Sequence, residues 1–249
     1  MKTYGLIGYR LGYSFSKGFF SDKFEKERLK NHEYVNFELD TINEFPSIFE
    51  KNDHIVGLNC TIPYKQEIMP FLDEIDEEAA KVGAINTVKI IPTKEGNKLK
   101  GFNTDIYGFE NSLVPMLSAQ HKKALILGTG GASKAIKHIL NKNEIGYLSA
   151  SIENELSEKE IRYEQIDAEL IKEFLIIINA TPLGTFPKVD ACPSIPYEHL
   201  TSDHVLFDLV YNPEETLFLK KGKEKGAATK NGLEMLHLQA IKAWEIWNM

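Results

Sequence analysis

The chain has 249 residues, of which 43% are hydrophobic and 26% charged, as is typical of a globular protein that forms one large domain or two smaller ones. The formal net charge of −7 and the lack of a basic cluster exclude a nucleic-acid-binding surface. Two cysteines without disulfide spacing, no signal peptide and no membrane-length apolar run predict a cytoplasmic protein with no membrane partner. The scattered histidines predict no metal site.

Short apolar strands alternate with helical patterns along the whole chain, which predicts a parallel α/β architecture. In the N-terminal part, strands are expected over residues 4–8, 34–39, 55–60 and 84–91. Helices are expected over residues 16–30, 42–52 and 76–82. The polar segment 92–98 predicts a hairpin turn.

A second group of elements begins with a helix over residues 105–117 and a strand over 123–127. A helix that follows a glycine turn, and strands over 146–150, 174–179 and 205–210, complete this group. An apolar stripe between Leu233 and Trp247 predicts a C-terminal helix that packs back on the first group. We therefore expect two domains: residues 1–104 with 232–249, and residues 105–231.

Three glycines, Gly128, Gly130 and Gly131, follow an apolar strand and open a helix, which is the context of a dinucleotide-binding turn. Glycine lets the backbone approach a pyrophosphate, whose charge the free N–H groups at the helix start can neutralise. Ser133 stands where the fingerprint usually has its third glycine, so a purely structural turn remains the alternative.

A run of polar residues surrounds Lys65, with Asn59 and Thr61 before it and Asn86 and Asp105 further along the chain. All are expected at or just after strand ends, where open α/β sheets form ligand crevices. A lysine beside an aspartate can pass a proton to and from an alcohol oxygen. The alternative for Lys65 alone is a surface lysine at the start of a short helix.

Two serines, Ser14 and Ser16, lie on the loop after the first expected strand. Their hydroxyls either bind a ligand or cap the helix that follows, since serine is favoured at that position.

Taken together, these residues resemble the shikimate dehydrogenase family along nearly the whole chain. The matching motifs, in the family's order, are S-x-S at 14–16, N-x-T-x-P-x-K at 59–65, G-A-x-N-T at 83–87, N-T-D at 103–105, G-x-G-G-A at 128–132, N-x-T-P-L-G at 179–184, D-x-x-Y-N-P-x-x-T at 208–216 and G-x-x-M-L-x-x-Q-A at 232–240.

The resemblance implies an N-terminal α/β substrate domain and a Rossmann-type doubly wound dinucleotide-binding domain, with the active site in the cleft between them. It implies that Lys65 is the catalytic acid/base and that Asp105 hydrogen-bonds both the lysine and the substrate. The other implied substrate contacts are Ser14 and Ser16 to a carboxylate, Asn59, Thr61, Asn86 and Gln239 to ring hydroxyls, and Tyr211 in the pocket wall. The implied cofactor contacts are Gly128, Gly130, Gly131 and Ala132 at the turn, and Asn179, Thr181, Gly232 and Met235 on the nicotinamide side.

The implied activity is the reversible NADPH-linked reduction of 3-dehydroshikimate to shikimate, in the chorismate pathway to aromatic amino acids. A quinate/shikimate dehydrogenase with relaxed substrate or NAD use is the enzymatic alternative. A non-catalytic dinucleotide-sensing paralogue is the alternative from another class, and the presence of both Lys65 and Asp105 weighs against it. We expect a monomer or a homodimer.

Two departures from the family pattern bear on binding. The serine loop, usually H-S-x-S-P, reads Tyr13-Ser14-Phe15-Ser16-Lys17. NADP-using members carry Asn-Arg-Thr after the second strand of the nucleotide domain, and residues 149–151 read Ser-Ala-Ser instead. Ala150 thus stands where the arginine is expected, and Glu153 is the nearest acid. Ser149 and Ser151 are expected to contact the cofactor phosphate weakly through their hydroxyls. We expect NADP as cofactor with weakened discrimination against NAD; if NADP is used strongly and exclusively, Lys134 is the first candidate for a substitute cation.

Overall fold

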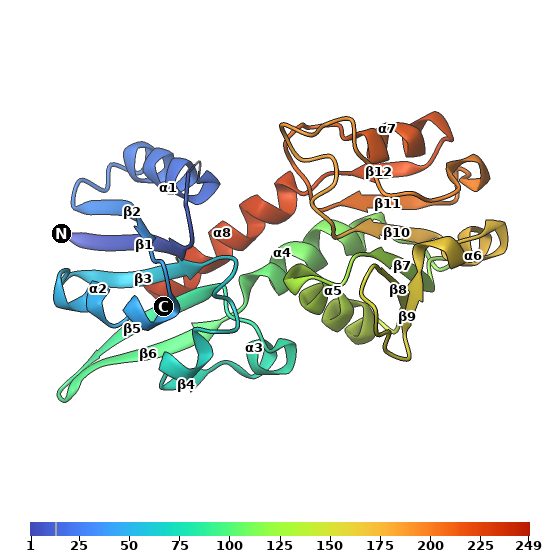
Figure 1. The fold of residues 1–249 in the computed structure, drawn as a ribbon. Coiled ribbons are helices and arrows are strands. Elements are labelled where there is room, and N and C mark those ends of the chain that lie inside the picture. The colour runs from blue at the N-terminus through green and yellow to red at the C-terminus, as the bar shows by residue number, and fades with distance from the viewer. Residues whose placement is uncertain (13) are drawn as a thin grey trace. The chain divides into compact units, whose positions relative to one another are not determined.

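The computed structural model describes residues 1–12 and 14–249, so that Tyr13 of the serine loop lies outside the described residues (Figure 1). The chain divides into two compact units, Met1–Thr104 with Gln239–Met249, and Asp105–Leu238. The sequence predicted the return to the first domain at residue 232, seven residues before the start of this second segment. The physical reason for the difference is that the segment before 239 is held within the second unit, where the Gly232 N–H donates to the Val210 carbonyl.

The first unit contains a six-stranded sheet in the order β2-β1-β3-β5-β6-β4. Its strands are β1 (Lys2–Gly8), β2 (His32–Glu38), β3 (Ile55–Cys60), β4 (Glu74–Ile75), β5 (Thr87–Thr93) and β6 (Gly96–Phe102). β1 pairs in parallel with β2 and β3, but β5 is antiparallel to both β3 and β6. The antiparallel pair β5–β6 is the hairpin predicted for the polar segment 92–98. Two residues join β5 to β6, and such a short turn can connect only antiparallel strands.

Helices cover both faces of this first sheet. On one face, α1 (Phe15–Lys26) and the end of α8 (Leu233–Asn248) share an aromatic core with the sheet. Trp247 anchors α8, because its indole N–H donates to the Val88 carbonyl at 3.0 Å and its ring fills the space beside Gly57. A Cβ atom at Gly57 would lie 2.4 Å from that ring, so only glycine fits there.

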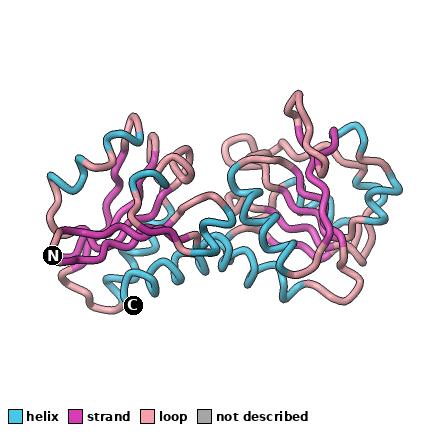
Figure 2. Tube along the Cα trace, turned by 90° about the horizontal axis from the view of Figure 1, so that it is seen from below, coloured by secondary structure: helices cyan, strands magenta, loops and turns pink. Residues whose placement is uncertain are grey.

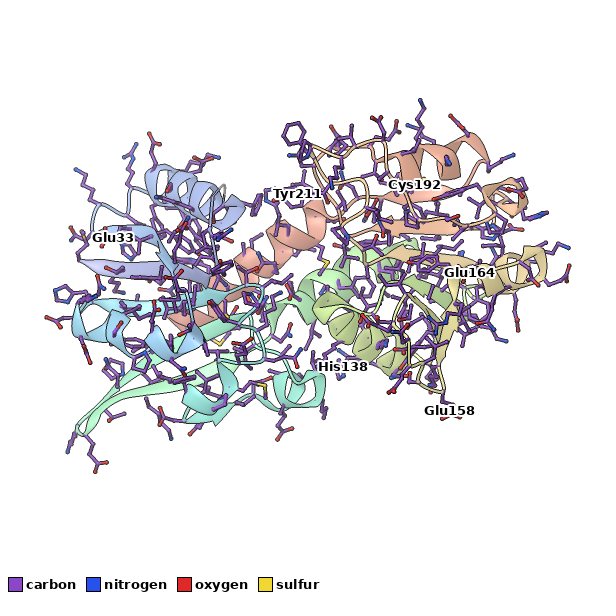
Figure 3. All side chains as sticks on the ribbon, in the orientation of Figure 1. Glu33, His138, Glu158, Glu164, Cys192 and Tyr211 are labelled. Carbon is purple, nitrogen blue, oxygen red and sulfur yellow. The ribbon has the colours of Figure 1, made fainter. Side chains whose placement is uncertain are left out.

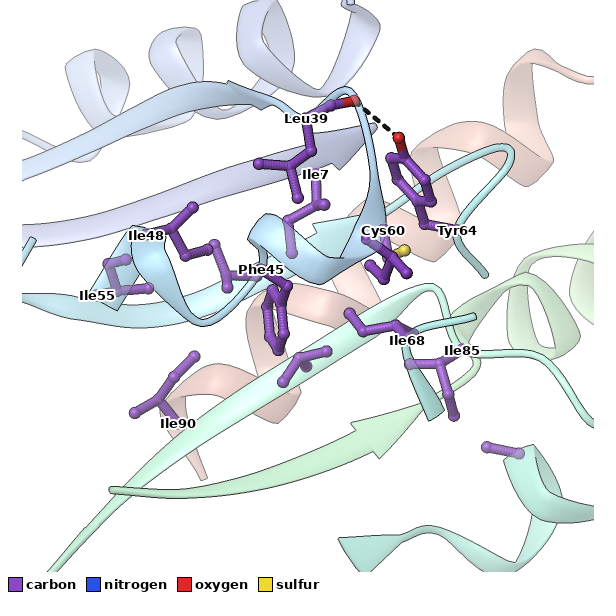
Figure 4. Close-up of a cluster of buried hydrophobic side chains, with 14 residues drawn as sticks. Ile7, Leu39, Phe45, Ile48, Ile55, Cys60, Tyr64, Ile68, Ile85 and Ile90 are labelled. Atoms are coloured by element: carbon purple, nitrogen blue, oxygen red, sulfur yellow. Dashed lines mark hydrogen bonds between the residues drawn. The ribbon is translucent and has the colours of Figure 1, made fainter. Parts of the chain in front are cut away.

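On the other face, α2 (Ser47–Glu50) and α3 (Glu77–Val82) cover a core of mainly aliphatic side chains (Figure 4). The helix expected over residues 42–52 is divided into a 3-10 turn at Ile42–Glu44 and α2. Pro46 lies between them, and its missing N–H interrupts the helical hydrogen bonds.

The second unit is a doubly wound α/β fold, with its six strands all parallel in the order β12-β11-β10-β7-β8-β9. Its strands are β7 (Lys123–Leu127), β8 (Gly146–Ser151), β9 (Glu160–Arg162), β10 (Ile176–Asn179), β11 (Val205–Asp208) and β12 (Ala228–Lys230). Its helices include α4 (Thr104–Leu113), α5 (Gly131–Lys142), α6 (Ala168–Glu173) and α7 (Leu217–Glu224). In Figure 2 the strands of each unit gather into a single sheet with helices beside it.

The order of the second sheet creates a switch point at β7, which has β8 on one side and β10 on the other. From β7 the chain first adds β8 and β9 on one side, and it then crosses to β10 on the other side of β7. The loops after β7 and β10 therefore diverge. Such a divergence leaves a crevice at the carboxyl ends of the strands. The Rossmann-type fold expected from the sequence is confirmed.

Among the helices that the structure describes, none combines the length and the apolar character that crossing a lipid bilayer would require.

Candidate active site

One edge of the first sheet gathers most of the expected substrate residues. Parallel strands β1 and β3 end at this edge, and the antiparallel β5 begins there, with Asn59 opposite Thr87. β6 ends at the same edge, with Phe102 opposite Thr87. Thr61, Asn86 and Thr104 adjoin these strand ends and therefore lie at the same end of the sheet.

The turn that carries Lys65 is fixed by hydrogen bonds from three directions. The Thr61 N–H donates to the Ile7 carbonyl at 2.9 Å, and the Ile85 N–H donates to the Lys65 carbonyl at 2.6 Å. The Tyr64 hydroxyl donates to the Leu39 carbonyl at 2.7 Å from within the core (Figure 4). The half-buried Lys65 side chain therefore starts from a rigid backbone.

Cys60 lies at the end of β3, immediately before this turn, and its side chain is buried. Burial raises the pKa of the Cys60 thiol to about 12, although the nearby Lys65 charge opposes that rise. The thiol therefore stays protonated at neutral pH and does not compete with Lys65 in proton transfer.

Asn59, expected to bind a ring hydroxyl, is hydrogen-bonded within the protein through both ends of its amide. Its side chain is 4% exposed. Its Oδ1 accepts from the Tyr34 hydroxyl at 2.8 Å, and its Nδ2 donates to the Asn86 carbonyl and to Thr87 Oγ1, each at 3.2 Å. Asn59 therefore supports its neighbours, and its amide has no further hydrogen to give to a ligand.

Asn86 is held so that its amide nitrogen remains available to a ligand. Its Oδ1 accepts from the Thr104 N–H at 2.7 Å, from Thr104 Oγ1 at 3.2 Å and from Thr87 Oγ1 at 3.1 Å. Thr104 Oγ1 also lies 3.4 Å from Gln239 Oε1 on α8. Thr104 was missed in the sequence, although it is the central residue of the N-T-D motif.

Ser14 is the N-cap of α1, and its Oγ accepts from the Lys17 N–H at 3.2 Å. The capping interpretation of the sequence is correct for this serine. Capping uses an oxygen lone pair and leaves the hydroxyl proton free to donate. Ser16 lies in the first helical turn, where the partial positive charge of the helix N-terminus suits a carboxylate.

The remaining expected substrate residues belong to the second unit. Asp105 is the second residue of α4 and is half-buried. Tyr211 follows β11 (Figure 3). The first unit thus brings together Ser14, Ser16, Asn59, Thr61, Lys65, Asn86 and Gln239, and the second unit carries the other two.

The glycine turn after β7 has the geometry of a dinucleotide site. Gly128 has a φ of +103°, and a Cβ atom there would lie 2.9 Å from Thr181 Cγ2, so glycine is required. Gly130 caps α5, and no atom within 4 Å crowds the Cβ positions of Gly130 and Gly131. These glycines, followed by Ala132 in α5, leave the N–H groups at the helix start open to a pyrophosphate.

A pocket of about 530 Å³ adjoins this turn, within the second unit. It lies between the loops after β7 and β10, at the switch point, with Gly128 and Thr181 in its wall. Ile152 and Glu153, from the loop after β8, line another part of the wall. Of the described residues that line this pocket, Glu153 alone carries a charge.

Asn179 is fully buried and holds Thr181, a residue of the pocket wall. Its Oδ1 accepts from the Thr181 N–H at 3.0 Å and from Thr181 Oγ1 at 2.6 Å, and its Nδ2 donates to Asp208 Oδ1 at 2.9 Å. Thr181 is therefore the residue of this pair that reaches the pocket.

Gly232, just before α8, is another position that admits no side chain. A Cβ atom there would lie 2.2 Å from the Leu209 carbonyl oxygen. Met235, in the first turn of α8, is half-buried.

The interpretation of residues 149–151 needs a correction. β8 runs to Ser151, so that Ser149 and Ala150 are fully buried within the strand. The Ser149 hydroxyl cannot reach a phosphate, and Ala150 is not the position of the missing arginine. Ser151 is 2% exposed, and its Oγ accepts from the Glu153 N–H at 3.1 Å. The first side chain that emerges beside the pocket is that of Ile152, which is 83% exposed.

The loop after β8 is held in place by a cation from the next strand. The Arg162 guanidinium donates to the Glu153 carbonyl at 2.5 Å and to the Asn154 carbonyl at 2.7 Å. Lys134, the substitute cation expected from the sequence, lies in the first turn of α5 and is half-buried.

Within the part of the chain that the structure describes, no group of three or more His, Cys, Asp or Glu side chains is arranged to hold a metal ion.

Comparison with known proteins gives consistent matches along the chain. Residues 6–88 match the family model described as the shikimate dehydrogenase substrate binding domain. A shikimate dehydrogenase (NADP(+)) of Methanococcus aeolicus is 39% identical, over 99% of this chain and 91% of that protein.

Two solved structures are similar over nearly the whole chain. One is a chorismate mutase/shikimate 5-dehydrogenase fusion protein from Clostridium acetobutylicum, with 37% identity, a TM-score of 0.84 and coverage of 99% of this chain and 91% of the other. The other is shikimate 5-dehydrogenase from Thermus thermophilus in complex with NADP(H) and shikimate, with 28% identity, a TM-score of 0.84 and coverage of 99% and 93%.

The buried carboxylate beneath the pocket predicts a pH dependence of stability. Burial raises the pKa of Asp208 to about 6, although hydrogen bonds from Thr216, Val210 and Asn179 oppose that rise. The folded protein therefore binds the Asp208 proton more tightly than the unfolded chain does. The free energy of unfolding should fall by about 2–3 kcal/mol as the pH rises from 4 to 7 through this group.

Urea unfolding at several pH values measures this effect. Asp208→Asn should remove this component of the pH dependence, and Asp190→Asn, at an exposed aspartate, should leave it intact. An identical pH profile for the wild type and Asp208→Asn would show that Asp208 does not titrate in this range.

Proposed function

Because the chain belongs to the shikimate dehydrogenase family, we propose that it catalyses the reversible NADPH-linked reduction of 3-dehydroshikimate to shikimate in chorismate biosynthesis. The observation that carries this proposal is the near-full-length match to a curated shikimate dehydrogenase (NADP(+)). The first unit supports it with donors for a polyhydroxylated acid, and the second with a dinucleotide turn.

In this proposal the N-terminus of α1 binds the substrate carboxylate. Ser14 keeps its hydroxyl proton while it caps the helix, and Ser16 lies in the same turn. The ring hydroxyls are bound by Thr61, by the amide nitrogen of Asn86 and by Gln239, with Tyr211 in the pocket wall. Asn59 contributes by holding Asn86 and Thr87.

The residues around Gly128 fit a dinucleotide. The open Cβ positions at Gly130 and Gly131 leave room for a pyrophosphate at the start of α5, and Thr181 and Met235 would contact the nicotinamide side. When bound, the reduced cofactor supplies the hydride for the keto carbon. Lys65 Nζ donates a proton to the oxygen that becomes the hydroxyl, and Asp105 orients Lys65 and holds the same hydroxyl.

NADP is the cofactor of the curated relatives, and we assign it to this chain. One observation favours the use of NAD as well. Ile152 and Glu153, in the loop after β8, line the wall of the dinucleotide pocket. A carboxylate there accepts hydrogen bonds from the ribose hydroxyls of NAD and repels a 2′-phosphate.

The expected cytoplasmic location and the monomeric or homodimeric state remain predictions. The two free cysteines, Cys60 and Cys192, are consistent with a reducing compartment.

Initial rates test the proposed activity directly. We expect the purified protein to oxidise shikimate with NADP faster than it oxidises quinate with either cofactor. The measurement is the formation of reduced cofactor with shikimate or quinate and with NADP or NAD, at fixed salt. Turnover of neither acid would refute the proposed function.

Lys65→Ala should lower kcat by about 10²–10⁴-fold, the usual effect of losing a general acid/base, with shikimate binding largely retained. Asp105→Asn should also lower kcat, and the two losses should be less than additive because the residues act together. Kinetics and calorimetric shikimate binding measure both effects. Lys94→Ala, at an exposed lysine in the β5–β6 turn, is the control. A near-wild-type kcat for Lys65→Ala contradicts the proton-transfer role.

Ile152→Arg should lower KM for NADP about tenfold, because a guanidinium forms charge-assisted hydrogen bonds with a 2′-phosphate. KM for NAD should change little. Glu153→Gln should lower KM for NADP and raise KM for NAD. The matched control is Ala150→Arg, which places the same charge in the interior of β8 and should destabilise the protein instead. A lower KM for NADP with Ala150→Arg alone would show that the assignment to Ile152 is wrong.

A further inference from the structure

We propose that Tyr34 is a positioning residue for the substrate site, which holds Asn86 in place through buried hydrogen bonds that pass through Asn59. This inference rests on the proposed function, in which Asn86 binds a ring hydroxyl. Tyr34 lies in β2, outside all the family motifs recognised in the sequence.

The phenol ring of Tyr34 is locked in the aromatic core of the first unit. The side chain is 4% exposed, and its ring stacks on Phe20 of α1 with centroids 4.8 Å apart and planes within 10°. A phenylalanine would pack equally well at such a position. The hydroxyl is therefore the part of this residue that needs an explanation, because a buried phenol hydroxyl requires a partner.

The Tyr34 hydroxyl contacts Asn59, one of the residues of the candidate site. It donates to Asn59 Oδ1 at 2.8 Å. Burial raises the pKa of Tyr34 far above its ordinary value, so the phenol keeps its proton and remains a donor.

The hydrogen-bond network runs from Tyr34 to Asn86 through Asn59. A phenol that donates to Asn59 holds the oxygen end of this amide, and the nitrogen end donates to the Asn86 carbonyl and to Thr87 Oγ1, each at 3.2 Å. The Thr87 proton has two acceptors within reach, Asn86 Oδ1 at 3.1 Å and Thr104 Oγ1 at 3.2 Å. The Thr104 N–H fixes the oxygen end of the Asn86 amide at 2.7 Å, so Asn86 presents its amide nitrogen to the ligand from a backbone that Asn59 holds.

Without the Tyr34 hydroxyl this network loses one of its buried donors. Asn59 Oδ1 would be buried without a donor, and the Asn59 amide would lose the bond that holds it against the Asn86 carbonyl and Thr87 Oγ1. A displaced Asn59 would shift Asn86 and weaken its hydrogen bond to the substrate. Neighbouring bonds in such a chain also strengthen each other, so the loss spreads beyond one pair.

The test is Tyr34→Phe, with Tyr4→Phe as its matched control. Tyr4 is the partner of Tyr34 in the neighbouring strand and is 1% exposed in the same aromatic core. Both variants lose one buried hydroxyl from the same unit. We expect Tyr34→Phe to raise KM and the calorimetric Kd for shikimate about tenfold, with kcat lowered less than about threefold. Tyr4→Phe should leave all three unchanged.

KM for NADP should be unchanged in both variants, because the dinucleotide turn belongs to the other unit. If Tyr34→Phe fails to fold, Thr87→Val and Thr87→Ser replace it. Thr87→Val removes the hydroxyl and should raise the Kd for shikimate. Thr87→Ser keeps the hydroxyl and should leave the Kd at the wild-type value. Unchanged shikimate binding in Tyr34→Phe, or an equal loss with Tyr4→Phe, overturns the proposal.

Failure of the proposed function gives a different result. A wild-type protein that binds shikimate without oxidising it would refute the catalytic role, and the Kd comparison would still decide on Tyr34. A wild-type protein that does not bind shikimate would overturn both proposals.

Discussion

Each unit depends on the same buried arrangement, an asparagine whose Oδ1 accepts from the backbone N–H and the hydroxyl of one threonine. In the first unit Asn86 binds Thr104 in this way, at 2.7 and 3.2 Å. In the second Asn179 binds Thr181, at 3.0 and 2.6 Å. Both asparagines stand at the sheet edge where the strands end, and there backbone N–H groups lose their ladder partners. The side-chain amide replaces those partners and fixes the loop that faces the ligand.

Such an amide needs support of its own, and the two units supply it differently. Asn179 is held by the carboxylate of Asp208, which keeps further bonds to Thr216 and the Val210 N–H. Asn86 is held by neutral groups, through Thr87 and Asn59. A buried carboxylate makes strong hydrogen bonds but titrates, whereas hydroxyls and amides do not. We therefore expect the hydrogen bonds that hold Asn179, in the dinucleotide-binding unit, to depend on pH, and those that hold Asn86 to be independent of it.

The sequence predicted the elements that carry a strong local signal. Apolar runs located β7 and β10, and glycines located the turn after β7, because burial and positive φ each require particular residues. The strands β4, β9 and β12 were missed, since each has two or three residues and shows no periodicity. The longer β6 was missed because its first residues were assigned to the hairpin turn. The end of β8 was placed one residue too early, and the Asn-Arg-Thr motif was matched to residues 149–151, which lie within the strand. That match made Ala150, instead of Ile152, the expected arginine position.

Motif matching proposed a set of substrate residues, but it could not separate side chains with a free donor from side chains already bonded within the protein. Asn59 and Asn86 look equivalent in the sequence, yet Asn59 has both ends of its amide engaged and Asn86 does not. The difference depends on Tyr34, which lies 25 residues before Asn59 and belongs to no motif. Arg162, in the dinucleotide-binding unit, is a second case that the sequence could not resolve. Its guanidinium donates to two backbone carbonyls of the loop after β8. A basic residue close to a phosphate site in sequence is thus no evidence of phosphate binding until its partners are known.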